Sequence, residues 1–158
     1  MMKVKHSFLV FAAAFLMVMP AFAKTGVVYQ RQDSLRIVSL LQQAKAMKKK
    51  PANWMMWFGK QFVGIPYVGG TLDRTREELL VVNTRELDCT TYVEIVTALT
   101  MCAKHQETSF AAFCNHLKHV RYIGGEVSYV KRQQYFTLWE DDNVKEGIVK
   151  DIQDNPPF

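Results

Sequence analysis

The 158-residue sequence contains only three cysteines, which are Cys89, Cys102 and Cys114. This number is too small for a disulfide scaffold, and the odd count leaves at least one thiol unpaired within the chain. The sequence also lacks internal repeats, low-complexity segments and dense basic runs, although its net charge is +5. A basic groove for nucleic acid is therefore not predicted. Hydrophobic residues make up 49% of the chain, which favours one domain with a core over a disordered tail.

A long hydrophobic run is also missing, because the apolar stretch from Phe8 to Met19 is too short to span a bilayer comfortably. Basic residues precede this stretch, and Ala21 and Ala23 are the small residues that signal peptidase requires. We therefore expect residues 1–23 to be a signal peptide rather than an uncleaved anchor. The mature chain, residues 24–158, is then exported and has no stable membrane span.

Hydrophobic periodicity outlines a helix-rich domain. One helix is predicted over residues 33–50, with Asp33 or Ser34 as its N-cap. A second, short helix is predicted to start at Asn53, and another is predicted over residues 108–119. Glycine and proline predict a shaped loop over residues 64–70. Short strands are predicted at Leu79–Val82 and Ile148–Val149. The apolar face predicted for the first helix consists of Leu35, Val38, Leu41 and Ala44.

The strongest helix signal begins at Asp88, which can serve as N-cap, and continues to about Lys104. Cys89 then lies at the helix N-terminus, where free backbone N–H groups and the helix dipole favour a thiolate over a thiol. Such a thiolate can attack a carbonyl carbon, and an N–H group of the same turn can bind the resulting oxyanion. The alternative is that Cys89 is an ordinary small buried residue.

Two segments together resemble a known family. Residues 62–72 contain the loop Gly64-Ile65-Pro66-Tyr67-Val68-Gly69-Gly70, and residues 87–94 contain an Asp-Cys pair that opens a helix. These segments resemble the NlpC/P60 cysteine hydrolases of bacterial cell walls, and more closely their DUF1460 branch of N-acetylmuramoyl-L-alanine amidase-like proteins. The resemblance covers about residues 53–152. It implies an α+β fold of the NlpC/P60 (papain-like) type, represented mainly by its helix-rich N-terminal portion with few strands, over residues 24–158.

The resemblance also implies a function and a set of site residues. Cys89 would be the nucleophile that cleaves the amide between N-acetylmuramic acid and L-alanine in peptidoglycan fragments. Tyr67, Asp88 and Thr90 would bind substrate or support the oxyanion. The implied partner is a peptidoglycan or muropeptide substrate in the periplasm or outside the cell, and no metal or cofactor is implied. The sequence does not indicate an oligomeric state.

The sequence departs from the family pattern at the general base. Family members carry a histidine on a strand well after the cysteine helix, often in a His-x-Gly segment, which is absent here. His105 lies roughly 24 Å from Cys89 along a continuous helix, whereas His119 could return to the level of Cys89 if the next helix is antiparallel, so it is a weak candidate base. Gln134 occupies a position where the family pattern has histidine. The resemblance therefore predicts a C-terminally truncated member that carries the nucleophile but lacks the segment with the catalytic histidine, on which activity of the chain by itself depends.

Two other functions remain open on the sequence alone. A non-catalytic peptidoglycan-binding module could stack Trp54, Trp57, Tyr67 and Tyr92 on its ligand, although helical spacing favours core packing for these aromatics. An exported zinc-binding domain could use Cys102 with His105 and Cys114 with His116 or His119. Cys102 and Cys114 could instead form a disulfide or remain reduced in the core.

Overall fold

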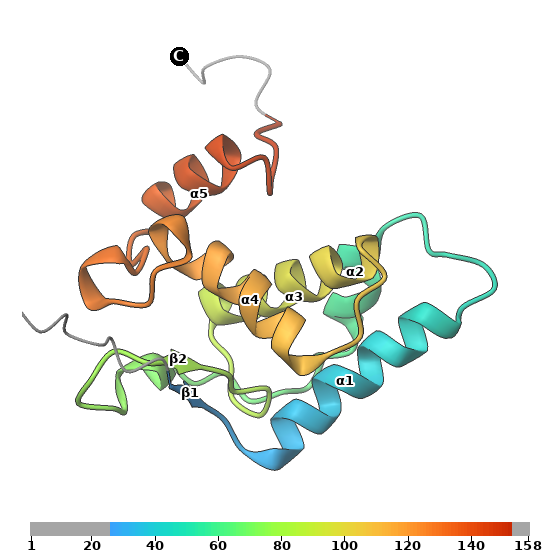
Figure 1. Ribbon diagram of the computed structural model, residues 1–158, viewed down its shortest axis with the longest axis horizontal. Coiled ribbons are helices and arrows are strands. Elements are labelled where there is room, and N and C mark those ends of the chain that lie inside the picture. The colour runs from blue at the N-terminus through green and yellow to red at the C-terminus, as the bar shows by residue number, and fades with distance from the viewer. Residues whose placement is uncertain (1–25, 153–158) are drawn as a thin grey trace, which may run out of the picture.

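The computed structural model describes residues 26–152, and α3 (Cys89–Lys104) lies at the centre of its helices (Figure 1). Helix α3 packs most extensively against α4 (Phe110–Arg121) and α2 (Trp54–Lys60) and also contacts α1 (Arg31–Ala46). Helix α5 (Phe136–Lys145) packs mainly against α4 and lies at the edge of the molecule. This helix-rich arrangement, with a small sheet, is consistent with the predicted α+β class.

The sheet in the described part of the chain has two short parallel strands, β1 (Val27–Val28) and β2 (Leu80–Val81). A separate parallel bridge joins Tyr67 to Leu87, with the Val68 N–H group donating to the Leu87 carbonyl at 3.0 Å. The Leu87 N–H group in turn donates to the Pro66 carbonyl at 3.1 Å. This bridge holds the loop over residues 64–70 beside the start of α3.

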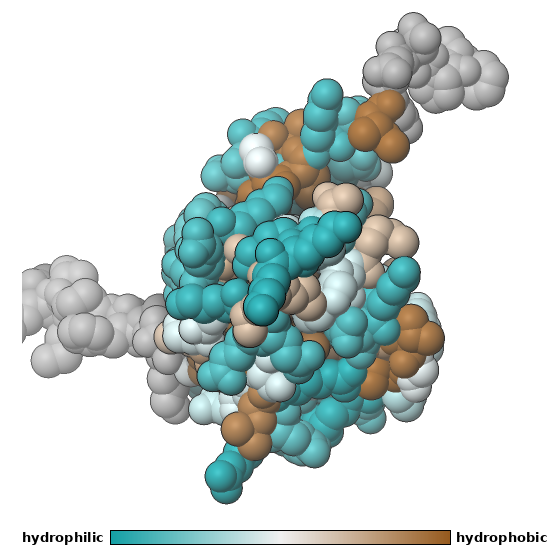
Figure 2. All heavy atoms as spheres, turned by 90° about the vertical axis from the view of Figure 1, so that its right-hand side faces the viewer, coloured by the Kyte–Doolittle hydropathy of each residue, from teal (hydrophilic) through white to brown (hydrophobic). Residues whose placement is uncertain are grey.

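The core lies between the helices and β2. Its fully buried side chains come from α1, α2, α3, α4 and β2, so each element contributes an apolar face to the same interior. The largest of these apolar groups are Phe58, Phe113, Ile37, Leu41, Leu80, Ile95, Leu99 and Leu117. The face of the molecule shown in Figure 2 is mainly hydrophilic, and its hydrophobic side chains lie in separate groups.

Helix α1 begins earlier than its sequence predicts. Gln30 is the N-cap, and Asp33 is the third helical residue, whose carboxylate accepts a hydrogen bond from the Gln30 N–H group at 2.9 Å. The prediction of Asp33 or Ser34 as N-cap is therefore wrong. Leu35 was expected on the buried face but is 58% exposed, because the helix turns Ile37, Leu40, Leu41 and Ala44 toward the core instead.

The C-terminal predictions are also corrected. The helix expected over residues 108–119 spans Phe110–Arg121 and is capped by the Ser109 hydroxyl. The aromatic segment before residue 140 forms the first turn of α5. Residues 148 and 149 form no strand, because their N–H groups both donate to the Asn143 carbonyl at the end of α5.

The predicted signal peptide, residues 1–23, lies outside the described residues. Within residues 26–152, no helix is long and apolar enough to cross a membrane. Three 3-10 turns complete the described structure: η1 (Thr71–Asp73), η2 (Ile123–Gly125) and η3 (Tyr129–Lys131).

Candidate active site

Local capping sets the position of Cys89. The Asp88 carboxylate accepts hydrogen bonds from the Thr91 N–H group at 2.8 Å and from the Thr91 hydroxyl at 2.7 Å. The Thr91 hydroxyl oxygen accepts from the Asp88 N–H group at 2.9 Å, which closes a reciprocal capping box. Cys89 is thus the first residue of α3, as predicted. The N–H groups of Cys89 and Thr90 have no carbonyl acceptor within the helix, which leaves them available to a ligand.

The Cys89 side chain is exposed and lies near two hydroxyl groups. Its sulfur is 3.9 Å from the Thr90 hydroxyl oxygen. The negative charge of the Cys89 thiolate and a hydrogen bond between Cys89 and Tyr67 raise the pKa of the Tyr67 phenol. Tyr67 is 75% exposed and held in place through its backbone bridge to Leu87. Exposure of Cys89 contradicts the alternative that it is a small buried core residue.

A cavity of about 260 Å³ surrounds Cys89. Apart from Asp88 and Cys89 itself, its lining is apolar or aromatic and comes from the turn and loop that follow α2, from the residue before the N-cap of α3 and from the first turn of α3. These lining residues are Phe62, Ile65, Tyr67, Leu87 and Tyr92. An electrophile bound here would meet the thiol and the neighbouring phenol together.

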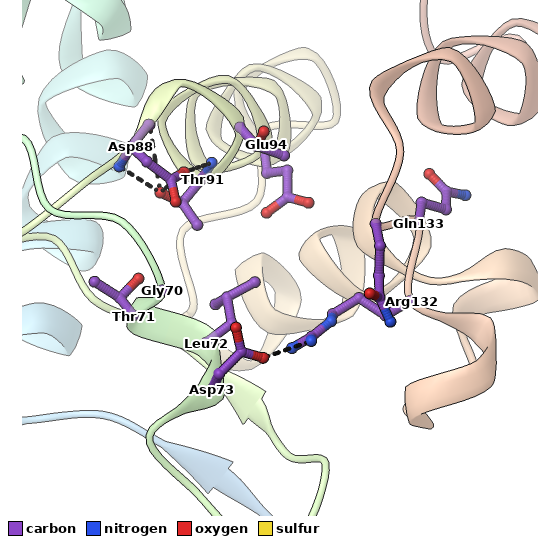
Figure 3. Close-up of a pocket in the computed structure, with 11 residues that line it drawn as sticks. Gly70, Thr71, Leu72, Asp73, Asp88, Thr91, Glu94, Arg132 and Gln133 are labelled. Carbon is purple, nitrogen blue, oxygen red and sulfur yellow. Dashed lines mark hydrogen bonds and ion pairs between the residues drawn. The ribbon is translucent and has the colours of Figure 1, made fainter.

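A second, polar cavity of about 210 Å³ lies on the other side of Asp88 (Figure 3). It is bounded by α3, by the turn that begins at Gly70, and by the segment that carries Arg132 and Gln133. Arg132 donates to Asp73 across this cavity at 2.5 Å. The Thr71 hydroxyl is buried in its wall and has no hydrogen-bond partner within residues 26–152. Asp88 lines both cavities, so they are adjacent.

A buried ion pair supports the wall of the polar cavity. The Arg121 Nε atom donates to the Glu94 carboxylate at 2.7 Å, and Nη1 donates to the Val81 carbonyl at 2.7 Å. Both charged side chains are almost fully buried. Burial raises the pKa of Glu94 by more than the neighbouring Arg121 lowers it. The sequence analysis did not find this pair, because its two residues lie 27 positions apart and follow no recognisable motif.

The structure does not bring His119 to Cys89. Its ring packs against η2, where a Cβ atom on Gly125 would lie 2.8 Å from the nearest ring atom. No histidine lines the cavity around Cys89 in the described part of the chain. The physical reason is the helical phase of α4, which directs Leu117, Val120 and Arg121 inward and leaves His119 exposed. The prediction of His119 as base therefore has no support in the geometry.

Two further histidines of residues 26–152 lie at the opposite end of α3. His105 is the residue after the last turn of α3, and its ring stacks on that of His116, with ring centroids 5.4 Å apart. Gln134, at the position where the family pattern has histidine, is exposed and lines the polar cavity. A histidine at this position would line the polar cavity, which shares Asp88 with the cavity around Cys89.

Comparison with known proteins decides the family. The family model described as N-acetylmuramoyl-L-alanine amidase-like matches residues 57–156, which is more than half of the chain. This chain belongs to the N-acetylmuramoyl-L-alanine amidase-like family. The match includes the second half of α2, the loop with Tyr67 and all of α3. A comparison with curated proteins found no match.

Solved structures agree with this membership of the amidase-like family. An N-acetylmuramoyl-L-alanine amidase from Bacteroides uniformis is 34% identical, with a TM-score of 0.55 over 66% of this chain and 41% of that chain. A DUF1460 protein from Legionella pneumophila is 26% identical, with a TM-score of 0.61 over 73% of this chain and 38% of that chain. The chain thus spans about two fifths of the length of these structures.

Proposed function

We propose that this chain acts as a cell-wall hydrolase in which Cys89 attacks the amide between N-acetylmuramic acid and L-alanine. The observation that carries this proposal is an exposed thiol at the first position of α3, beside the Tyr67 phenol, in a member of an amidase-like family. Buried cysteines in the same chain, Cys102 and Cys114, lack this exposure.

The reaction would form and break two bonds in turn. The Cys89 thiolate attacks the carbonyl carbon of the lactoyl group, and the carbonyl oxygen becomes an oxyanion. The N–H groups of Cys89 and Thr90, which have no acceptor within the helix, would donate to this charge, and the Tyr67 hydroxyl would donate to it as well. Collapse of this intermediate breaks the C–N bond, and the leaving L-alanine nitrogen takes up the proton that the base removed from the Cys89 thiol. Water then hydrolyses the thioester, which releases the lactoyl group as a carboxylic acid and regenerates the thiol.

The polar cavity supplies the site for the peptide stem in this proposal. Its side chains offer both charge signs and the unpartnered Thr71 hydroxyl, which matches the carboxylates and amides of a muropeptide. The wall of the Cys89 cavity is mainly apolar, which suits the lactoyl methyl group. Asp88 holds the start of α3 between these two cavities and is occupied by its capping bonds.

The proton acceptor for Cys89 is the part of the machinery that residues 26–152 do not place at the thiol. Family resemblance assigns this task to a histidine beyond the cysteine helix in an NlpC/P60-type fold. Export to the periplasm or the outside of the cell by removal of residues 1–23 stays a prediction. Free imidazole can replace a missing histidine base in an experiment, because it has the same proton affinity.

An assay on muropeptides tests the proposal. The full chain is incubated with muropeptides, with and without added imidazole, and release of peptides that begin with L-alanine is measured by mass spectrometry. We expect release that imidazole accelerates, that falls at least 100-fold in Cys89→Ser and that persists in the matched variant Cys114→Ser. Tyr67→Phe, which retains the ring, should lower the rate by about tenfold.

Two results would contradict this function. Release that is unchanged in Cys89→Ser would show that another group performs the chemistry. Binding of muropeptides without release, even with imidazole, would favour the non-catalytic binding module instead.

A further inference from the structure

The end of α3 opposite to Cys89 gathers three side chains that can ligate a metal. Helix α3 stops at His105, and Gln106 then adopts a left-handed conformation with φ of 60°. The chain consequently turns back, and the Glu107 N–H group donates to the Cys102 carbonyl at 2.9 Å. This turn positions Glu107 over the last turn of α3, where Cys102 is fully buried.

Helix α4 supplies the third group. The His116 Nε2 atom lies 2.6 Å from the Glu107 carboxylate. The ligand atoms of Cys102, Glu107 and His116 all lie within 4.8 Å of one another. His116 is oriented further by its parallel stacking on His105. A thiol, a carboxylate and an imidazole thus converge on one point between the two helices that pack together most extensively.

We propose that Cys102, Glu107 and His116 form a structural zinc site that joins the end of α3 to α4. Sulfur, nitrogen and oxygen ligands at about 2.0–2.3 Å from a tetrahedral ion are about 3.3–3.7 Å apart, so shifts of about 1 Å convert the present cluster into a coordination shell. The Glu107 side chain is 43% exposed and free to make this adjustment, and water can complete the tetrahedron on its side.

The donor set selects the metal. Calcium and magnesium prefer shells made of oxygen, whereas a thiolate with an imidazole favours zinc. Without a metal, burial and the nearby Glu107 charge raise the pKa of the Cys102 thiol to about 12, so this sulfur stays protonated. A zinc ion would replace that proton and neutralise the carboxylate at the same time.

The cluster differs from the zinc set that the sequence predicts. Cys114 is buried beside a different cavity, lined by Tyr29 and Phe110, and His119 lies against η2. Glu107 was missed, because only the turn at Gln106 brings it to Cys102. Cys102 and Cys114 are both free thiols, so Cys102 remains available as a ligand.

The proposed zinc site is independent of the proposed hydrolase function. Cys102 lies 13 positions after Cys89 on α3, a distance of about 20 Å along the helix axis. Zinc at this end therefore does not contact the reacting atoms. Its effect would be to clamp the two helices, which can be measured without any enzymatic assay.

Metal binding by the full chain tests the proposal. The chain carries Cys89→Ser, so that the exposed thiol cannot bind metal, and it is kept reduced with a phosphine. Zinc chloride binding is measured by calorimetry, and cobalt(II) chloride is added separately to record the near-ultraviolet thiolate-to-cobalt band. We expect one zinc per chain, a thiolate band, and a higher unfolding temperature with zinc.

Matched variants assign the ligands. Zinc affinity should fall at least tenfold in Glu107→Gln and in His116→Asn, whereas His119→Asn should bind as before. The thiolate band should vanish in Cys102→Ser and persist in Cys114→Ser, a buried cysteine of the same core. If Cys102→Ser does not fold, the two surface variants alone decide the result. Absence of stoichiometric zinc binding, or binding that Glu107→Gln and His116→Asn leave unchanged, would overturn the proposal.

Discussion

Replacement of Arg121 by methionine should strongly destabilise the fold. The Arg121 guanidinium is held between the Glu94 carboxylate and the Val81 carbonyl, each at 2.7 Å. In Arg121→Met, the aliphatic part of the side chain is retained while the charge and both donors are lost. Glu94 is then left as a buried carboxylate with no cation beside it.

The magnitude follows from these contacts. Removal of one partner of a buried ion pair costs about 3–5 kcal/mol, and the orphaned Val81 carbonyl adds about 1 kcal/mol. A loss of about 4–6 kcal/mol is a large part of the 5–15 kcal/mol that domains of this kind possess. With a urea m-value of about 1.5–2 kcal/mol per molar, the unfolding midpoint should move by about 2–4 M.

The pH dependence adds a second signature. Burial already raises the pKa of Glu94, and loss of Arg121 raises it further. A carboxyl group whose pKa is raised by folding stabilises the protein below its unfolded pKa, and this contribution is lost as the pH rises through the folded pKa. The penalty of Arg121→Met should therefore be largest at neutral pH and should shrink in acid.

Urea unfolding followed by tryptophan fluorescence measures both effects. The double variant Glu94→Leu with Arg121→Met should recover most of the lost stability, because neither charge remains buried. Lys131→Met is the matched control, since its pair with Glu126 at 2.5 Å is exposed and contributes less than about 1 kcal/mol. A midpoint shift below about 0.5 M for Arg121→Met, or a double variant no more stable than the single one, would refute the reasoning.

Two further predictions concern the start of α1 and the loop before η1. Burial alone would raise the pKa of Asp33, but hydrogen bonds from the backbone and side chains of its neighbours, Thr84 and Arg85 among them, lower it. This carboxylate therefore stabilises the fold at pH values above its unfolded pKa, and this contribution is lost as the pH falls below about 4. Asp33→Asn should consequently lower the free energy of unfolding by about 2 kcal/mol at pH 7 and by progressively less in acid. An equal penalty at pH 7 and pH 3 in urea titrations would contradict this. The second prediction compares two glycines at which a Cβ atom would be unhindered: Gly70 has φ of +69°, whereas Gly69 has no positive φ. Gly70→Ala should therefore destabilise the fold by about 1–2 kcal/mol. Gly69→Ala should be neutral or should stabilise the fold by up to about 1 kcal/mol. Thermal unfolding of the two variants checks the difference, and equal effects would show that backbone conformation does not decide it.

Sequence reasoning was most successful where structure depends on near neighbours. Asp88 was predicted as an N-cap and Cys89 as the first helical residue, and both are confirmed. Asn53 was likewise predicted at the start of α2 and caps it through the Met56 N–H group. Capping joins residues three positions apart, so the chain itself carries the information.

Prediction failed where two local signals competed. At α1, Asp33 and Ser34 are both good N-caps, but the extended conformation of Gln30 and the buried bonds of Asp33 to Thr84 move the start to Arg31. Thr84 lies 51 positions after Asp33 in the sequence, and hydrophobic periodicity does not reveal such a distant contact. Near the C-terminus, the residues at 148 and 149 have strand propensity but are held by the Asn143 carbonyl instead.

The sequence by itself determined the central helix, its cap, the position of a thiol at its start and, through short motifs, the family. These features depend on contacts between residues a few positions apart or on motifs that can be recognised directly in the sequence. Only the tertiary structure decided which distant groups meet: Tyr67 beside Cys89, Glu94 with Arg121, Glu107 and His116 above Cys102, and His119 away from the thiol. The physical reason is that contacts between distant residues depend on which face of each helix points inward and on how the helices pack. A change in the backbone conformation of one turn residue, such as Gln106, alters the direction of the chain and with it these contacts.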